Sequence, residues 1–410
     1  MLVVGQGARE HAIAKKLAEG DVELHAAMAH RNPGIAGLSK RSEIMDITNP
    51  GLFDVFGDVD IAFIGPEAPL AAGVTDRLSE MGVPVVGPTR EAARLEWSKA
   101  FARQFLEDHG IEGNPEFRIC RSLADVRGFL RDHKEVAVKP DVLTGGKGVK
   151  LTGEHLHSAS DVEAYALERI REDGLVVIDE KLVGREFTLQ AFTDGNRLEI
   201  MPLVRDYKRA YDGDRGPNTG SMGSYSCPDH GLPDLSKAAV RKGSEIMEGT
   251  IRALSKSVGA FRGVLYGGFM ETERGVFLIE YNARLGDPEA INVLSLLRKP
   301  LIDIGWEVVD GRLTRPSFEG RATVCVYLVP EGYPTNPRKD ARVEISPPRR
   351  SELYFASVQE VDGAIRTTSS RSIALLAKGE TVSEAREKVY SDMPGIRGEL
   401  YYRKDIGLGV

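Results

Sequence analysis

Two oxygen-bearing side chains stand two positions apart in the segment Phe277-Leu278-Ile279-Glu280-Tyr281-Asn282. The apolar neighbours predict a strand, and alternate residues of a strand project from one face, so Glu280 and Asn282 are expected to point the same way. One carboxylate and one amide suit Mg²⁺, which takes few protein ligands and completes its shell with phosphate oxygens. Arg284 and the string Gly286-Asp287-Pro288-Glu289 follow, and Pro288 suits the start of a helix. Together these features indicate a phosphoryl-transfer site, with a solvent-facing edge strand as the alternative.

A lysine and a glycine-rich loop are the second candidate. Lys139 ends the apolar strand expected over 135–139, where a charge is costly unless it meets an anion. The loop Thr144-Gly145-Gly146-Lys147-Gly148 is not a Walker loop, because no Ser or Thr follows Lys147 and a strand replaces the helix. A glycine turn with a lysine at its tip suits a lid over phosphates, although an ordinary hairpin loop has the same pattern.

Two further segments have weaker patterns. An apolar strand over 175–182 turns polar at Asp179 and Glu180 and breaks at Gly184, as a hinge between two lobes would, although an acidic edge strand fits equally well. The exposed backbone of such a hinge can bind an adenine edge while a carboxylate holds the ribose. A long polar loop is expected over 205–230, and loops of this length are often lids or ligand clamps.

The turn Gly5-Gln6-Gly7-Ala8-Arg9-Glu10 resembles a dinucleotide-binding fingerprint, but Glu10 stands where that motif needs a small residue. The functional interpretation is an anion site at a helix N-terminus, with Arg9 nearby, for a phosphorylated substrate rather than NAD. A plain tight turn is the alternative.

Three structural units are predicted to position these candidates. Residues 1–90 alternate short strands (2–4, 60–64, 83–86) with glycine turns and helices, which predicts a parallel sheet, and a long helix is expected over 89–109. The middle predicts a capping box at 160–163, strands over 186–192, 197–203, 263–272 and 276–281, and a six-turn helix ending near 259. The remainder predicts a strand over 322–329, a Pro-rich crossing at 331–348 and a helix over 382–390.

The predicted fold class is α/β and α+β multidomain. It consists of an N-terminal parallel α/β domain (1–98), a central domain of two lobes (99–305, with a mobile lid lobe at about 120–192) and a small C-terminal α+β domain (306–410).

Composition excludes several classes of protein. Fifty-four Lys and Arg against sixty-one Asp and Glu give a net charge of −7, which argues against a nucleic-acid-binding protein. No apolar run reaches the ~18 residues of a membrane helix, and no signal peptide is expected. Three widely spaced cysteines predict neither a disulfide framework nor a zinc ribbon, so a cytoplasmic location is expected.

In this order and spacing, Lys139, the 145–148 loop, the hinge and Glu280 with Asn282 resemble the ATP-grasp ligases. Within them, the chain resembles the phosphoribosylamine–glycine ligase family, the glycinamide ribonucleotide synthetases of purine biosynthesis, over essentially its whole length. The motifs for this closer resemblance are Gly65-Pro66-Glu67-Ala68-Pro69-Leu70, Ser98-Lys99-Ala100-Phe101, Gly216-Pro217-Asn218-Thr219-Gly220 and Arg284-Leu285-Gly286-Asp287-Pro288-Glu289.

The resemblance implies a central ATP-grasp fold and a C–N ligase that joins glycine to 5-phosphoribosylamine through a glycyl phosphate. It implies Arg284 and Lys139 as catalytic residues, and Glu280 and Asn282 as ligands of Mg²⁺ or Mn²⁺. Gly268 stands where relatives offer another ligand, which leaves a second metal open. ATP would be held by Lys99, Lys139, Gly145, Gly146, Lys147, Gly148, Glu180, Leu182 and Glu186. The other substrates would be held by Gly7, Glu67, Asp206, Lys208, Asn218, Thr219, Arg284 and Asp287. Only small-molecule partners are expected, in a monomer or weak homodimer.

Three alternatives stay open at this point. Another ATP-grasp carboxylate–amine ligase or a biotin-dependent carboxylase subunit is disfavoured by Pro217-Asn218-Thr219 and by the string from Arg284 to Glu289. A non-catalytic nucleotide-binding regulator could keep Lys139 and the hinge, but it would not need Glu280, Asn282 and Arg284 together. An NAD-dependent dehydrogenase ranks last, because of Glu10.

Overall fold

The N-terminal unit is a parallel five-stranded sheet, as the alternating pattern predicts. In the computed structural model, which describes residues 1–143 and 148–410, the strand order is β3-β2-β1-β4-β5, and every neighbouring pair is parallel. The elements are β1 (Leu2–Val4), α1 (Ala8–Leu17), β2 (His25–Met28), α2 (Pro33–Leu38), β3 (Arg41–Ile44), η1 (Pro50–Phe56), β4 (Ala62–Ile64), α3 (Glu67–Ala72), α4 (Val74–Glu80) and β5 (Val85–Val86).

The first turn of this sheet is built around a buried carboxylate. Glu10 accepts hydrogen bonds from the Gly7 N–H and from Arg9 Nε, both at 2.6 Å. Glycine at position 65 makes room for it, because a Cβ there would lie 2.3 Å from Glu10 Cγ. Glu10, the residue that argues against NAD binding, therefore closes the turn, because its carboxylate accepts the hydrogen bond of the Gly7 amide.

Replacing Gly65 with alanine is expected to destabilise the protein by about 2 kcal/mol, because the added methyl group must displace a buried, hydrogen-bonded side chain. The measurement is the free energy of unfolding in urea. Gly37→Ala is the matched control, since a Cβ there meets nothing within 4 Å, and it should change stability by less than about 0.5 kcal/mol. Equal stability of the two variants would show that Glu10 does not fill the turn.

The prediction of one continuous helix over 89–109 is wrong. The chain forms two helices, α5 (Arg94–Trp97) and α6 (Lys99–Asp108), with Ser98 extended between them. The Ser98 hydroxyl caps α6 by accepting the Phe101 N–H at 3.1 Å, and Asp141 accepts the Ala100 N–H at 2.8 Å. This N-cap ends the first helix and makes Lys99 the first residue of the second.

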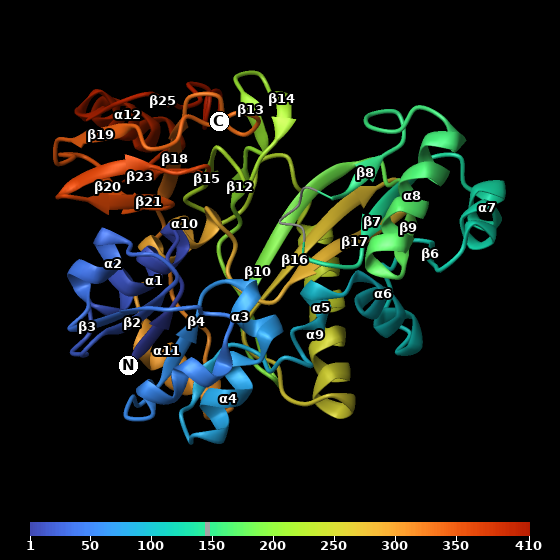
Figure 1. Ribbon diagram of the computed structural model, residues 1–410, viewed down its shortest axis with the longest axis horizontal. Coiled ribbons are helices and arrows are strands. Elements are labelled where there is room, and N and C mark those ends of the chain that lie inside the picture. Colours follow the sequence, from blue (N-terminus) through green and yellow to red (C-terminus); the bar gives the residue numbers. More distant parts are fainter. Residues whose placement is uncertain (144–147) are drawn as a thin grey trace.

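Two four-stranded antiparallel sheets form the middle of the chain. One sheet, in the order β6-β9-β7-β8, belongs to the lobe predicted to be a lid and is called the lid sheet; it has its own hydrophobic core and stands at the right of Figure 1. The other, the central sheet, has the order β11-β10-β16-β17 with α9 packed on it. The lid contains β6 (Phe117–Cys120), α7 (Leu123–Asp132), β7 (Val136–Pro140), β8 (Lys150–Leu151), α8 (Ala159–Asp173) and β9 (Val176–Glu180). The central lobe contains β10 (Arg185–Asp194), β11 (Leu198–Ile200), α9 (Lys237–Ser257), β16 (Arg262–Thr272) and β17 (Gly275–Asn282).

The capping box of α8 lies two residues earlier than expected. Ser158 and Asp161 form it, in place of the predicted pair Ser160 and Glu163. Both serines are followed three residues later by an acidic residue, so the local pattern does not distinguish them.

The long loop expected over 205–230 is also wrong, because it contains four short strands. They are β12 (Arg205–Asp206), β13 (Arg209–Tyr211), β14 (Arg215–Asn218) and β15 (Gly223–Ser226). β13 and β14 pair with each other, whereas β12 and β15 extend the C-terminal sheet through the antiparallel pairing of β15 with β18 (Ala322–Pro330). A partner about a hundred residues further along the chain leaves no local signal in the sequence.

The C-terminal unit is built on the sheet β12-β15-β18-β23-β20 and lies at the upper left of Figure 1. β19 (Arg342–Ile345) lies within the Pro-rich crossing, and α12 (Val382–Asp392) confirms the predicted helix. The other elements of this unit are β20 (Glu352–Phe355), β21 (Val358–Val361), β22 (Ala364–Thr367), β23 (Ile373–Gly379), η2 (Met393–Gly395), β24 (Ile396–Arg397) and β25 (Leu400–Tyr401). Two helices precede it in the chain, α10 (Glu289–Leu296) and α11 (Leu301–Val309), and α11 packs on β10, β16, β5 and α1. Across the described residues, none of the helices combines the length and apolarity that a membrane crossing requires. The predicted fold class is confirmed.

Candidate active site

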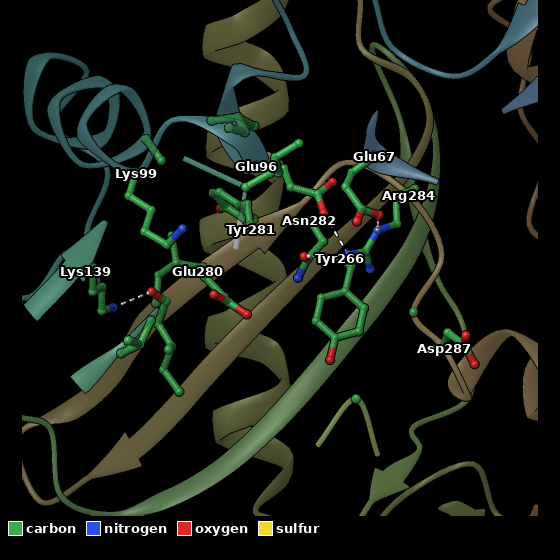
Figure 2. A pocket seen from close by; sticks show the side chains of 18 of the residues that line it. Glu67, Glu96, Lys99, Lys139, Tyr266, Glu280, Tyr281, Asn282, Arg284 and Asp287 are labelled. Atoms are coloured by element: carbon green, nitrogen blue, oxygen red, sulfur yellow. Dashed lines mark hydrogen bonds and ion pairs between the residues drawn. The ribbon is translucent and has the colours of Figure 1, made fainter. Parts of the chain in front are cut away.

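One cleft brings together most of the predicted site residues. It lies along β17 and is closed by residues from α3, α6, β7, β12 and the start of α10. Figure 2 shows Glu280, Asn282 and Arg284 in succession, with Glu67 and Glu96 near the arginine and Lys139 beyond Glu280. The predicted residues that line the cleft are Glu67, Lys99, Lys139, Asp206, Lys208, Thr219, Glu280, Asn282, Arg284 and Asp287.

A β-bulge shapes the strand at the centre of the cleft. Gly268 of β16 faces Glu280, and Phe269 faces Leu278, so Ile279 has no partner on β16. A bulge bends its strand and redirects the side chains next to it. Glu280 and Asn282 both follow the bulge, and both line the cleft, as the spacing of two predicts.

The donor set at this point fits a hard divalent cation. The Glu280 side chain makes no hydrogen bond or ion pair with any residue in the described part of the chain, and Asn282 Oδ1 accepts one hydrogen bond from Arg284 Nη2 at 3.1 Å. Within 1–143 and 148–410, His, Cys, Asp and Glu side chains form no group of three or more that could hold a metal. A cation here would therefore depend on two protein oxygens and on phosphate oxygens, which is the usual coordination of Mg²⁺ beside nucleotides.

Arg284 links two carboxylates that have opposite pKa shifts. Its guanidinium lies 2.7 Å from Glu96 and 3.3 Å from Glu67. Burial raises the pKa of Glu96 to about 7, even though Arg284 opposes the shift. Burial acts on Glu67 as well, but Arg284 and Arg9 outweigh it and lower the pKa of Glu67 to about 2. Neighbouring groups with divergent pKa values are typical of active sites.

Replacing Glu67 with glutamine should reduce the loss of stability in acid. The folded-state pKa of Glu67 lies below its ordinary value of 4.5, so its stabilising effect is present above pH 4.5 and is lost as the pH falls toward 2. For this partly exposed side chain, the wild-type free energy of unfolding falls by about 2 kcal/mol over this pH range. The Glu67→Gln variant has no carboxylate at this position, so this decrease does not occur in it. Urea unfolding between pH 5 and pH 3 would measure the onset of this difference, and parallel curves for the two proteins would contradict the assignment.

The far end of the cleft is held by the C-terminal unit. Asp287 accepts hydrogen bonds from the Tyr327 hydroxyl and from Arg371 Nη2, the latter at 2.9 Å. Arg371 also donates to the carbonyls of Gly220 and Ser221, next to Thr219 in the cleft. The C-terminal unit therefore positions two segments that the sequence analysis assigned to substrate binding.

The remaining predicted residues lie elsewhere. Glu180 and Leu182 line a separate hollow beside the hairpin of β16 and β17, where Glu180 pairs with Arg274. Glu186 does not line the cleft, but it forms an ion pair with Lys208, which lines the cleft. Asn218 is exposed on β14. The Gly148 carbonyl accepts a hydrogen bond from the Tyr165 hydroxyl at 2.6 Å, and the Gly7 N–H donates to the Glu10 carboxylate. Gly145, Gly146 and Lys147 lie outside the described residues.

Five further polar residues of the cleft were not assigned a role from the sequence: Glu96, Arg103, Tyr266, Tyr281 and Glu289. Glu289 accepts the Tyr266 hydroxyl at 3.0 Å, and burial together with Asp206 raises its pKa to about 7. Glu289 could have been predicted from the sequence as a site residue, because it lies in the string that follows Arg284. Glu96 and Arg103 sit on short helices with no distinctive spacing, so only the three-dimensional structure identifies them.

The fold is that of the ATP-grasp enzymes, and comparison with known proteins identifies the class as a ligase that forms C–N bonds. Three family models match, described as phosphoribosylglycinamide synthetase N domain (residues 1–96), ATP-grasp (A) domain (97–290) and C domain (323–409). The chain belongs to this phosphoribosylglycinamide synthetase family.

Similar proteins agree over nearly the whole length. Phosphoribosylamine–glycine ligase of Methanoregula boonei is 46% identical, covering 99% of this chain and 96% of the relative, and that of Thermococcus gammatolerans is 45% identical, covering 99% and 94%. The crystal structure of phosphoribosylamine–glycine ligase from Thermotoga maritima has a TM-score of 0.86 at 30% identity, covering 99% of each chain. Biotin carboxylase from Campylobacter jejuni shares the fold alone, with a TM-score of 0.75 at 15% identity, covering 99% of this chain and 94% of the other.

Proposed function

We propose that this protein ligates glycine to 5-phosphoribosylamine with ATP, producing glycinamide ribonucleotide, ADP and phosphate for purine biosynthesis. The observation that supports this proposal most strongly is the 46% identity, over almost the full length, to a curated phosphoribosylamine–glycine ligase. The cleft agrees with it, because cationic side chains, an arginine–carboxylate network and the Glu280 carboxylate, which has no ion pair within residues 1–143 and 148–410, converge there. A monomer or weak homodimer in the cytoplasm is the accompanying proposal.

The chemistry needs no protein nucleophile. A carboxylate oxygen of glycine attacks the γ-phosphorus of ATP, the bond to the β-phosphate oxygen breaks, and glycyl phosphate and ADP result. The amine of phosphoribosylamine then attacks the glycyl carbonyl carbon, the C–O bond to phosphate breaks, and the amine loses a proton. Positioning and charge neutralisation accelerate both steps.

The cleft residues divide these tasks in the proposal. Lys99 and Lys139 bind phosphate oxygens of ATP, and Arg284 neutralises the phosphoryl group as it is transferred. Glu280 and Asn282 hold Mg²⁺ or Mn²⁺, which supplies further charge neutralisation when bound. Glu67, Asp206, Lys208, Thr219 and Asp287 orient glycine and phosphoribosylamine. Adenosine binding by Glu180, Leu182, Glu186 and the 145–148 loop, and substrate contacts from Gly7 and Asn218, remain predictions.

Omission of single substrates tests the proposal. Phosphate release is expected only when ATP, glycine and phosphoribosylamine are all present, because the second step consumes the acyl phosphate formed in the first. Phosphate release and glycinamide ribonucleotide formation would both be measured, with alanine and serine in place of glycine as controls for specificity. Equal release without glycine would exclude this ligase, and equal turnover with alanine would indicate another carboxylate–amine ligase. Nucleotide binding without turnover would indicate a regulator.

A further inference from the structure

Three buried charged side chains meet where the lid contacts the central sheet. The side chains of Arg103 on α6, Lys139 on β7 and Asp179 on β9 are only 4%, 8% and 2% exposed. The Asp179 carboxylate lies 2.6 Å from Arg103 Nη2 and 2.7 Å from Lys139 Nζ. Two cations thus share one anion, and breaking such a buried group is costly because it leaves a charge without its partner.

The same two cations share a main-chain acceptor on β17. The carbonyl of Ile279, the bulged residue, accepts from Lys139 Nζ at 3.0 Å and from Arg103 Nη2 at 2.8 Å. Arg103 Nη1 also donates to the Leu278 carbonyl at 3.1 Å. A single guanidinium therefore spans a helix, a lid strand and the strand that bears Glu280.

We propose that Arg103 and Asp179 are positioning residues, which fix the lid strand bearing Lys139 against the strand bearing Glu280. They set the spacing between Lys139, the proposed phosphate-binding lysine, and Glu280, the proposed metal ligand. They do so at the base of the lid lobe, because Asp179 directly precedes Glu180, where the hinge is predicted. The planar, multidentate guanidinium suits this role, and a lysine cannot reproduce its fork of donors. Of the two tests described below, only the turnover test rests on the proposed function.

The alternative is that the cluster only balances charge. Arg103→Lys separates the two interpretations, because it keeps the charge and removes the fork. Arg127→Lys is the matched control, since Arg127 is also paired with a carboxylate, Glu163 at 2.9 Å, but on the exposed side of the lid.

The first test measures ADP affinity by calorimetry on the full-length protein. Positioning predicts that Arg103→Lys weakens ADP binding at least about fivefold and that Arg127→Lys stays within about twofold of wild type. Wild-type affinity in Arg103→Lys would overturn the proposal. Because this measurement needs no ligation, it judges the positioning role even if the proposed reaction is wrong.

The second test asks whether Asp179 acts through Lys139. In the wild-type background, Asp179→Asn should lower kcat at least about tenfold and leave the KM for glycine unchanged. In a Lys139→Met background, the same substitution should lower kcat less than about threefold. Equal losses in both backgrounds would show that Asp179 does not act through the lysine and would overturn its positioning role. If Asp179→Asn fails to fold, Arg103→Lys replaces it in the same cycle.

Discussion

Glu280→Gln is expected to lower kcat at least about 100-fold while the protein stays folded. Glu280 lies in the cleft beside Asn282 without a hydrogen bond or ion pair in the described part of the chain. Its charge is therefore available to a cation, and glutamine keeps the shape while removing that charge. Steady-state turnover at saturating Mg²⁺, together with the far-ultraviolet circular dichroism spectrum, would measure both parts of the expectation.

The control for this variant is Glu245→Gln, which removes a carboxylate from the exposed face of α9. It should leave kcat within about twofold of wild type, as surface substitutions usually do. If Glu280→Gln also turned over at that rate, Glu280 would have no part in the mechanism, and the metal site would have to be sought elsewhere.

Arg284→Met should affect both turnover and stability. The guanidinium contacts Glu96, Glu67 and Asn282, so its loss leaves Glu96 without its ion-pair partner and Glu67 with Arg9 alone, at 3.9 Å. We expect kcat to fall about 100-fold or more and the free energy of unfolding to fall by about 3–5 kcal/mol. The measurements are turnover and urea unfolding.

Arg284→Lys separates the two effects, because it restores a positive charge without the fork of donors. Stability should return in part, while kcat should stay well below that of wild type. Arg312→Met, which removes an exposed arginine paired with Asp310, should change neither. Full turnover in Arg284→Lys would mean that charge alone is needed at this position.

The sequence predicted those parts of the molecule that local patterns determine. Three strands of the N-terminal sheet (β1, β4 and β5), the six-turn α9 and the hairpin of β16 and β17 were predicted, because periodicity and turn residues specify them locally. Strands β2 and β3 of the same sheet were not predicted. The continuous helix over 89–109 failed because one serine, Ser98, forms an N-cap within it. Strand β15 was missed because its sheet partner, β18, lies about a hundred residues away, and β12 was missed with it because it pairs with β15.

The candidate site divides in the same way. Glu280, Asn282, Arg284 and Lys139 were found because a charged or amide side chain in or beside an apolar strand is itself a signal. The bulge at Ile279 and the role of Arg103 had no such signal, since they depend on packing between α6, β9 and β17. Asp179 does follow an apolar run, but its pairing with a residue of α6 left no trace in the sequence.

The most direct test of the central claim is a crystal structure with ADP and Mn²⁺, in which anomalous scattering locates the metal. The account predicts a peak bonded to one Glu280 oxygen and to Asn282 Oδ1 at about 2.1–2.2 Å and shared with a phosphate oxygen of the nucleotide. A peak elsewhere, with both side chains facing solvent and the diphosphate away from β17, would contradict it.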